Sequence, residues 1–274
     1  MNTSFFDTVL QSWKFLFRHW KQCLPLYGMD MLFFLALSFV SVIIMERMAE
    51  HLVALTTIAG MMGEQLQELQ GEALQAVMLY QEQFQMQYRA VLQYLFLFLV
   101  AVFLLWVVLQ GYNWKKTYSL LGMNIPVKQF YGRFFALNGL CFVVALLVSI
   151  ALIQFSTPKI SGMRLLTEGI AMVLAALVFL FLAYLLFVGY GMMNIPIKQS
   201  IQKLFPHAFK NLARSFPAFL LVLLLSGIIL KLMQLASSQS AFLVVLLLLF
   251  GLLPVMAWAR VFLIQIIHGK HHTG

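Results

Sequence analysis

Six long apolar stretches constrain the fold of this chain more than any other feature of its sequence. A helix needs about 20 apolar residues to cross the hydrocarbon core of a bilayer. The stretches lack the alternation of apolar and polar residues that marks a barrel strand. The sequence therefore predicts an all-α, polytopic membrane protein with six transmembrane helices. The predicted spans cover residues 28–45, 91–111, 139–156, 169–190, 216–233 and 241–266, the last kinked at Pro254.

The composition excludes two other classes of protein. Hydrophobic residues make up 62% of the 274 residues and charged residues only 10%, against about half and a quarter in a soluble domain. This excess of apolar residues argues against a soluble globular enzyme and against a disordered chain.

Positive charge is distributed unevenly between the two sides of the predicted membrane domain. The termini and the links 111–138 and 190–215, with Arg260 counted toward the C-terminal side, hold 13 of the 18 Lys and Arg residues, and the other side holds 5. The acidic residues show the opposite bias, since 7 of 9 lie on the side with fewer cations. Cytoplasmic loops are enriched in Lys and Arg, so both termini are expected in the cytoplasm. The net charge of +9 thus reports orientation, and no nucleic acid is expected as a partner.

An internal repeat organises the single predicted membrane domain, 1–274. The segment 123–129 (MNIPVKQ) recurs as 193–199 (MNIPIKQ), 70 positions later, and the N-terminus aligns with the second copy at a shift of 192. We expect three parallel repeats, 1–122, 123–192 and 193–274, each an interfacial amphipathic helix followed by a transmembrane hairpin. Because every unit enters from the same side, these are not the inverted repeats of many secondary transporters.

The amphipathic stretches are the predicted lipid-binding elements. In the first, Phe6, Val9 and Trp13 share a face at helical spacing with further apolar residues, and cations occupy the opposite face. Such a helix lies in the headgroup layer, where its cations attract anionic lipids. The candidate headgroup-binding residues are Lys14, Arg18, Lys21, Lys128, Arg133, Lys198, Lys203, Lys210 and Arg214.

An external insert, 46–90, interrupts the first repeat. The sequence predicts a turn at 60–63 (GMMG) and then a helix, 64–89, that runs into the second span and reaches about 40 Å. One interpretation is a helical hairpin packed on residues 46–58. The other is a coiled-coil-like contact with a second protomer or an envelope protein.

Asp30 is the only acid inside a predicted span, which makes it the candidate intramembrane polar residue. As an N-cap it would satisfy free backbone N–H groups. A structural pair with a nearby Lys or Arg and a role in transport or catalysis are the alternatives.

The sequence contains no constellation typical of an enzyme, a metal site or a cofactor site. It lacks the nucleophile-elbow, zincin and P-loop motifs and has no paired carboxylates at workable spacing. Cys23 and Cys141 are not expected to form a disulfide in a reducing compartment. His268, His271 and His272 are read as a tail rather than a metal site.

The layout resembles the uncharacterised six-span bacterial inner-membrane proteins of the YciC type and the membrane domains of glycerophosphoryl diester phosphodiesterases. The features that carry the resemblance are the amphipathic helices before spans one and five, the Gln-rich insert, and the basic-aromatic segment 258–262 (WARVF). The resemblance implies an inner-membrane location and assigns no catalytic residue.

These observations favour a non-enzymatic protein of the cytoplasmic membrane that binds anionic headgroups and acts in membrane organisation or as an assembly subunit. The alternative is a transporter or channel component for an apolar or amphiphilic substrate. Membrane lipids are the expected partners, with a second copy or an envelope protein as a possible partner of helix 64–90.

Overall fold

The fold is known from a computed structural model that describes residues 5–67, 71–156 and 168–268. Within these ranges the regular structure is entirely helical. The chain forms two compact units. Unit 1 contains residues 1–30 and 110–274, and unit 2 contains residues 31–109.

Six helical segments among the described residues are long and apolar enough to cross a membrane. This confirms the expected multi-pass, all-helical architecture, because each predicted span falls on one of the six. The segments are 20–62, 79–120, 127–152, 169–191, 212–237 and 241–268.

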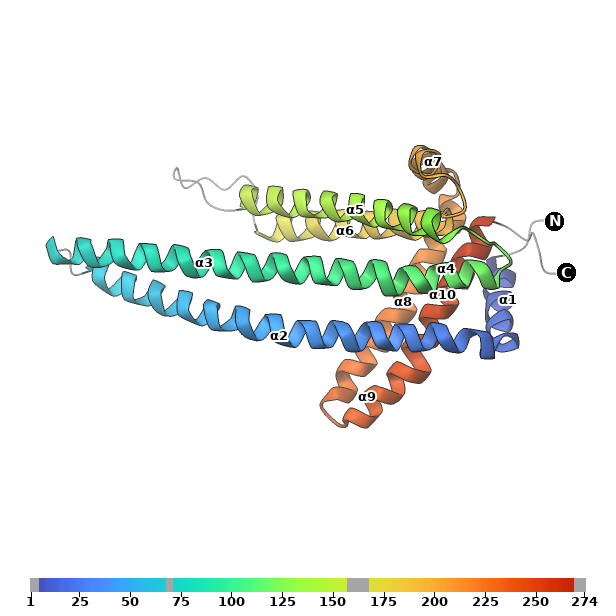
Figure 1. Cartoon of the computed structure of the whole chain (residues 1–274), viewed down its shortest axis with the longest axis horizontal. Helices are drawn as coiled ribbons and strands as arrows, with labels where there is room; N and C mark the ends of the chain where they lie inside the picture. Colours follow the sequence, from blue (N-terminus) through green and yellow to red (C-terminus); the bar gives the residue numbers. More distant parts are fainter. Residues whose placement is uncertain (1–4, 68–70, 157–167, 269–274) are drawn as a thin grey trace. The chain divides into compact units, whose positions relative to one another are not determined.

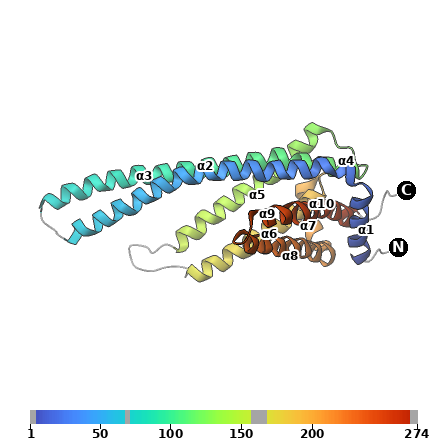
Figure 2. The same ribbon diagram turned by 90° about the horizontal axis from the view of Figure 1, so that it is seen from below.

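Unit 1 contains most of the helices (Figures 1 and 2). Helix α1 (Phe5–Arg18) precedes the first turns of α2 (Trp20–Gln67), and α4 (Gly111–Leu120) begins just after the chain returns from unit 2. The α5–α6 hairpin, helix α7, and a second hairpin of α8 with α9 and α10 follow. Their bounds are α5 Val127–Ser156, α6 Glu168–Gly191, α7 Ile197–Lys210, α8 Leu212–Ser237, α9 Ala241–Leu247 and α10 Leu253–His268.

Unit 2 is a long helical hairpin made by the rest of α2 and by α3 (Gly71–Leu105). Nδ1 of His51 lies 2.6 Å from Oε1 of Gln87, and its ring stacks on Tyr94. The insert therefore packs on α2 of the same chain, as the hairpin interpretation expects. The 48 residues of α2 extend about 70 Å at 1.5 Å per residue, more than twice the hydrocarbon thickness.

The turn predicted at 60–63 is wrong. Helix α2 continues through both glycines to Gln67, and the next helix begins at Gly71 rather than at Glu64. An isolated glycine costs a helix only about 1 kcal/mol, so the two glycines do not end this 48-residue helix.

Two helix breaks separate the amphipathic helices from the spans that follow them. One break lies at His19, between α1 and α2, and the other at Asn211, between α7 and α8. These positions are 192 residues apart, which is the shift that aligns the N-terminus with the second MNIP segment. A proline follows each break by six residues, Pro25 and Pro217.

The stretch after the first MNIP segment has no such break, so the expectation of a separate amphipathic helix is wrong here. Helix α5 runs without interruption from Val127 to Ser156. Cys141 and Leu147 occupy the positions of Asn211 and Pro217. Neither residue frees a carbonyl or bends the backbone as proline does.

The link between α4 and α5 closes on a glycine. Gly122 adopts a positive φ of 79°. The Met123 amide donates to the Tyr118 carbonyl, and the Gly122 amide donates to the Ser119 carbonyl. This pair of bonds is a Schellman motif, in which glycine tolerates the left-handed conformation that ends a helix.

Two π-helical turns interrupt the spans. One, Trp106–Gln110, lies between α3 and α4, and the other, Leu248–Leu252, lies between α9 and α10. The second turn immediately precedes Pro254, whose missing N–H removes one α-helical bond. The helix continues past the proline as expected, with the irregularity absorbed one turn earlier.

A hydrophobic core of unit 1 joins α1, the start of α2, α8 and α10. Its buried members are Leu16, Cys23, Leu26, Ala218, Val255, Ala257, Trp258 and Phe262. Both cysteines of the chain are buried and free.

Candidate functional site

Helix α1 is docked on α10 through one of its faces. Ser12 and Leu16 are buried on this face, and Nε1 of Trp258 donates to the Ser12 hydroxyl at 2.9 Å. The Trp13 ring stacks on the Trp258 ring, with centroids 5.3 Å apart and planes 9° apart. Stacked aromatic pairs add about 0.5–1.5 kcal/mol to the energy of burial, so this dock fixes α1 to the bundle.

The rest of α1 divides into two exposed sectors. Successive residues advance about 100° around a helix, which places Phe6, Leu10 and Phe17 in a sector beside the docked face. Their exposed fractions are 77%, 56% and 73%. Lys14 and Arg18 are exposed in the next sector. The sequence pattern predicted an apolar face and a cationic face, and the structure adds that part of the apolar face is used for docking.

Helix α7 repeats this division into three sectors. Leu204 and Ala208 are buried in its docked sector, and the Tyr184 hydroxyl of α6 donates to the Ala208 carbonyl at 2.9 Å. Phe205 and Phe209 are exposed in the adjacent sector. The exposed cations Lys203 and Lys210 occupy the third sector, whereas the exposed Lys198 lies in line with Phe205 and Phe209.

His207 borders the cationic sector of α7. Burial lowers its pKa, and the nearby Lys210 ammonium lowers it further. Its Nε2 atom is buried and has no hydrogen-bond partner among the described residues. The ring is therefore neutral near pH 7 and adds no charge to the lysines around it.

The remaining predicted cations differ in their surroundings. Lys21 is exposed and lies 5.8 Å from the centre of the Trp20 ring, in a cation–π contact. Lys128 and Arg214 are exposed. Arg133 is half-buried and donates to the Met193 carbonyl at 2.8 Å. Its guanidinium therefore ties α5 to the second MNIP segment and is less available to a headgroup than the exposed cations.

Two other side chains hold the link between α6 and α7, where the second MNIP segment lies. The Tyr118 hydroxyl of α4 donates to the Tyr190 carbonyl at 2.6 Å and accepts from the Met193 amide. Nε2 of His268 lies 2.7 Å from the Gly191 carbonyl oxygen. His268 thus belongs to α10 and its packing, whereas His271 and His272 lie outside the described residues.

Helices α1 and α7 lie at the same end of unit 1. Both run crosswise to the α5–α6 hairpin, near the ends of α5 and α6 that carry Val127 and Gly191 (Figure 1). The structure therefore brings the cations of α1 and α7 to the same end of unit 1.

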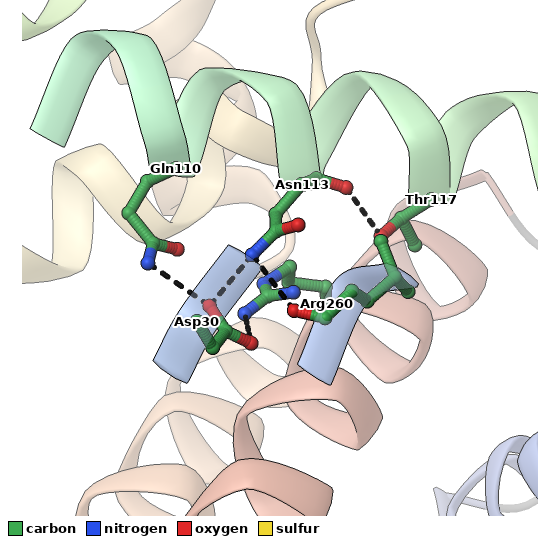
Figure 3. Close-up of polar contacts among 6 residues, drawn as sticks. Asp30, Gln110, Asn113, Thr117 and Arg260 are labelled. Atoms are coloured by element: carbon green, nitrogen blue, oxygen red, sulfur yellow. Dashed lines mark hydrogen bonds and ion pairs between the residues drawn. The ribbon is translucent and has the colours of Figure 1, made fainter. Parts of the chain in front are cut away.

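A buried polar cluster lies in the same unit, centred on Asp30 (Figure 3). Nη2 of Arg260 donates to Oδ2 of the carboxylate. Oδ1 accepts from Nε2 of Gln110 at 2.9 Å and from Nδ2 of Asn113 at 2.7 Å. The Asp30 side chain is 0% exposed and that of Arg260 is 3% exposed. Three donors thus surround one buried carboxylate, the arrangement that burial of a charge requires.

The N-cap interpretation of Asp30 is wrong. Helix α2 begins at Trp20, ten residues earlier, so the backbone around Asp30 has its own helical bonds. The alternative of a structural pair with a basic residue describes the observed contact. The sequence placed Arg260 among the loop cations, although a cation inside the apolar stretch 241–266 is itself a signal of an intramembrane partner.

Asn113 was missed because an isolated amide carries no sequence signal. Its Nδ2 also donates to the Leu26 carbonyl at 3.2 Å. Oδ1 of Asn113 and Nη1 of Arg260 are buried without a hydrogen-bond partner among the described residues. Ordered water commonly satisfies buried polar atoms of this kind. No group of three or more His, Cys, Asp or Glu within the described ranges could hold a metal ion.

Comparison of the chain with models of protein families, with curated proteins and with solved structures finds no match. The resemblance to YciC-type proteins and to phosphodiesterase membrane domains therefore stays a prediction.

Proposed function

We propose that this chain is a non-enzymatic integral protein of the cytoplasmic membrane. Its helices α1 and α7 bind anionic lipid headgroups, and the bundle acts in membrane organisation or as an assembly subunit. One observation carries the proposal. Both helices present exposed cations next to an exposed aromatic sector, while a third sector fixes them to the bundle.

The chemistry of these sectors fits an anionic lipid surface. Aromatic and aliphatic side chains enter the boundary between headgroups and acyl chains, and Lys and Arg remain at the level of the phosphates. Each Lys or Arg near an anionic surface contributes about 1 kcal/mol to the free energy of binding to that surface. A nucleic acid would use the cations but would leave Phe6, Phe17 and Phe209 exposed to water.

The polar cluster supports the non-enzymatic part of the proposal. Both carboxylate oxygens of Asp30 already accept hydrogen bonds from protein donors. A general acid or base must instead reach a substrate proton. The cluster is better suited to joining α2, α4 and α10.

We also propose that the bundle consists of three parallel repeats that close on one another. One contact at each junction between repeats supports this arrangement. Tyr118 of α4 packs on Phe130 of α5, Tyr184 of α6 binds α7, and Trp258 of α10 binds α1. In each case the returning span of one repeat contacts the entry helix of the next, and the last span contacts the first helix.

The test of headgroup binding uses variants of equal charge change. Lys14, Arg18 and Lys21 are replaced by Gln in one variant, and Lys198, Lys203 and Lys210 in a second. Arg47, Arg89 and Lys231, which lie on the opposite predicted side, are replaced by Gln in the control. Native mass spectrometry then measures the ratio of phosphatidylglycerol to phosphatidylcholine retained by each purified protein from an equal mixture.

Removal of three cations at about 1 kcal/mol each is expected to reduce the preference for phosphatidylglycerol by roughly a hundredfold at the sites of that helix. The control is expected to keep the preference of the unmodified protein. An equal loss in all three variants, or an unchanged ratio in the first two, would contradict the proposal.

A further inference from the structure

The docks of α1 and α7 prevent these helices from leaving the bundle independently. On α1 the Trp13–Trp258 stack and the Ser12–Trp258 hydrogen bond act together. On α7 the Tyr184 hydroxyl contacts both the Ala208 carbonyl and, at 2.7 Å, the hydroxyl of Ser215 in α8. Many surface-binding amphipathic helices bind and dissociate reversibly, whereas these two are held at the surface by the fold.

The exposed apolar sectors therefore occupy one leaflet permanently. Each helix has 14 residues, which gives a length of about 21 Å. An interfacial helix buries its apolar face about 5–10 Å into the boundary between headgroups and acyl chains. Two such helices at one end add volume to one leaflet in the region of the headgroups.

The other end of unit 1 has less structure of this kind in the part of the chain that is described. There α8 and α9 are joined by the short turn 238–240. The volume that the interfacial helices insert is thus greater in the leaflet that contains α1 and α7.

We propose that α1 and α7 form a permanent double wedge that directs this protein to convex, loosely packed regions of an anionic leaflet. A convex leaflet has gaps between its headgroups that the sectors of Phe6, Phe17, Phe205 and Phe209 fill. Membrane binding by amphipathic helices is sensitive to curvature for this reason. The inference rests on the proposed interfacial location of α1 and α7, and it adds the kind of membrane surface that these helices select.

The experiment compares two exposed apolar pairs with a matched control pair. Phe6→Ser with Phe17→Ser alters α1, and Phe205→Ser with Phe209→Ser alters α7. Leu235→Ser with Phe242→Ser alters exposed residues at the α8–α9 end. All six side chains are exposed, although Phe17 also stacks on Trp13 and Phe205 contacts the Phe181 ring. Fluorescence of single vesicles measures protein density on small and large vesicles of one phosphatidylcholine–phosphatidylglycerol composition, for molecules with their termini outside.

The unmodified protein and the control pair are expected to be several-fold denser on the smallest vesicles. Both wedge variants are expected to lose most of this preference. A density independent of vesicle size in the unmodified protein would overturn the inference. So would a preference retained by both wedge variants, or lost equally by the control.

The two triple-Gln variants that remove the cations of α1 or α7 distinguish this inference from the proposed headgroup binding. Loss of the α1 or α7 cations is expected to leave the size preference in place, because curvature acts on the apolar sectors. If these variants keep their lipid ratio while the size preference depends on the phenylalanines, the headgroup proposal fails and the wedge stands. If the lipid ratio falls as expected but no size preference exists, the wedge fails and headgroup binding stands.

Discussion

Asp30 shows how one residue can be held as a charge inside an apolar bundle. Its carboxylate is fully buried and accepts from Arg260, Gln110 and Asn113. Desolvation of two ions costs several kcal/mol, and their mutual attraction offsets this only with good geometry and further hydrogen bonds. The pair therefore specifies which helices meet, and loss of either partner leaves an uncompensated charge.

Replacement of either partner is expected to destabilise unit 1 strongly. Asp30→Asn or Arg260→Gln alone should lower the free energy of unfolding by about 3–5 kcal/mol. The double variant should recover most of this loss, because a neutral amide pair can still hydrogen-bond with Gln110 and Asn113. Denaturant unfolding in detergent, followed as a double-mutant cycle, measures the coupling.

The exposed pair Arg47–Glu50 provides the control for this cycle. Its atoms are 3.3 Å apart, but the side chains are 61% and 57% exposed. Neutralising either residue should change stability by less than about 1 kcal/mol. Additive single effects at Asp30 and Arg260, with no coupling, would contradict a structural ion pair.

At the scale of elements, α1 and α7 have the same order of sectors. A docked face, an exposed aromatic sector and a cationic sector follow one another around each helix. Hydrophobic periodicity alone separates apolar from polar positions. It cannot divide the apolar positions between protein and lipid, because both environments favour the same side chains.

Trp258 is expected to control the attachment of α1. Trp258→Phe removes the donor to Ser12 and keeps an aromatic ring beside Trp13, so we expect a loss of about 1 kcal/mol. Trp258→Ala should cost about 3–5 kcal/mol and release α1. The rate of trypsin cleavage after Lys14 and Arg18 measures the release.

Trp20→Phe serves as the matched control, because Trp20 is 53% exposed. This variant should be cleaved at the rate of the unmodified protein. Unchanged cleavage in Trp258→Ala would show that α1 is held by other contacts.

At the scale of the whole molecule, the six apolar helices make the chain a multi-pass membrane protein. The distribution of Lys and Arg predicts which side each link occupies. With six spans, the termini, the 121–126 link and α7 share one side by parity. The same parity predicts that the α8–α9 turn and the insert 46–90 face the other side.

Single cysteines are expected to report this orientation. In a background of Cys23→Ala and Cys141→Ala, Ser238→Cys should react in intact cells with a maleimide that cannot cross membranes. Asn124→Cys should react only after the membrane is permeabilised. Both positions are exposed, so the difference reflects sidedness, and the reverse pattern would invert the predicted topology.

The prediction of helix ends was less successful than the prediction of spans. The turn at 60–63 failed because glycines are tolerated in a long packed helix. The separate amphipathic helix expected before the span 139–156 failed because α5 has no counterpart of Asn211 and Pro217. Local patterns identify which segments are helical, but packing decides whether two helical segments join.

The sequence by itself determined the six membrane helices and the amphipathic character of α1 and α7. Both properties follow from the hydrophobicity and spacing of nearby residues. Only the tertiary structure decided that Asp30 meets Arg260, 230 residues away, and that Trp258 holds α1. These contacts join segments distant along the chain, and the physical requirement behind them, that a buried charge or donor has a partner, does not specify which partner it is.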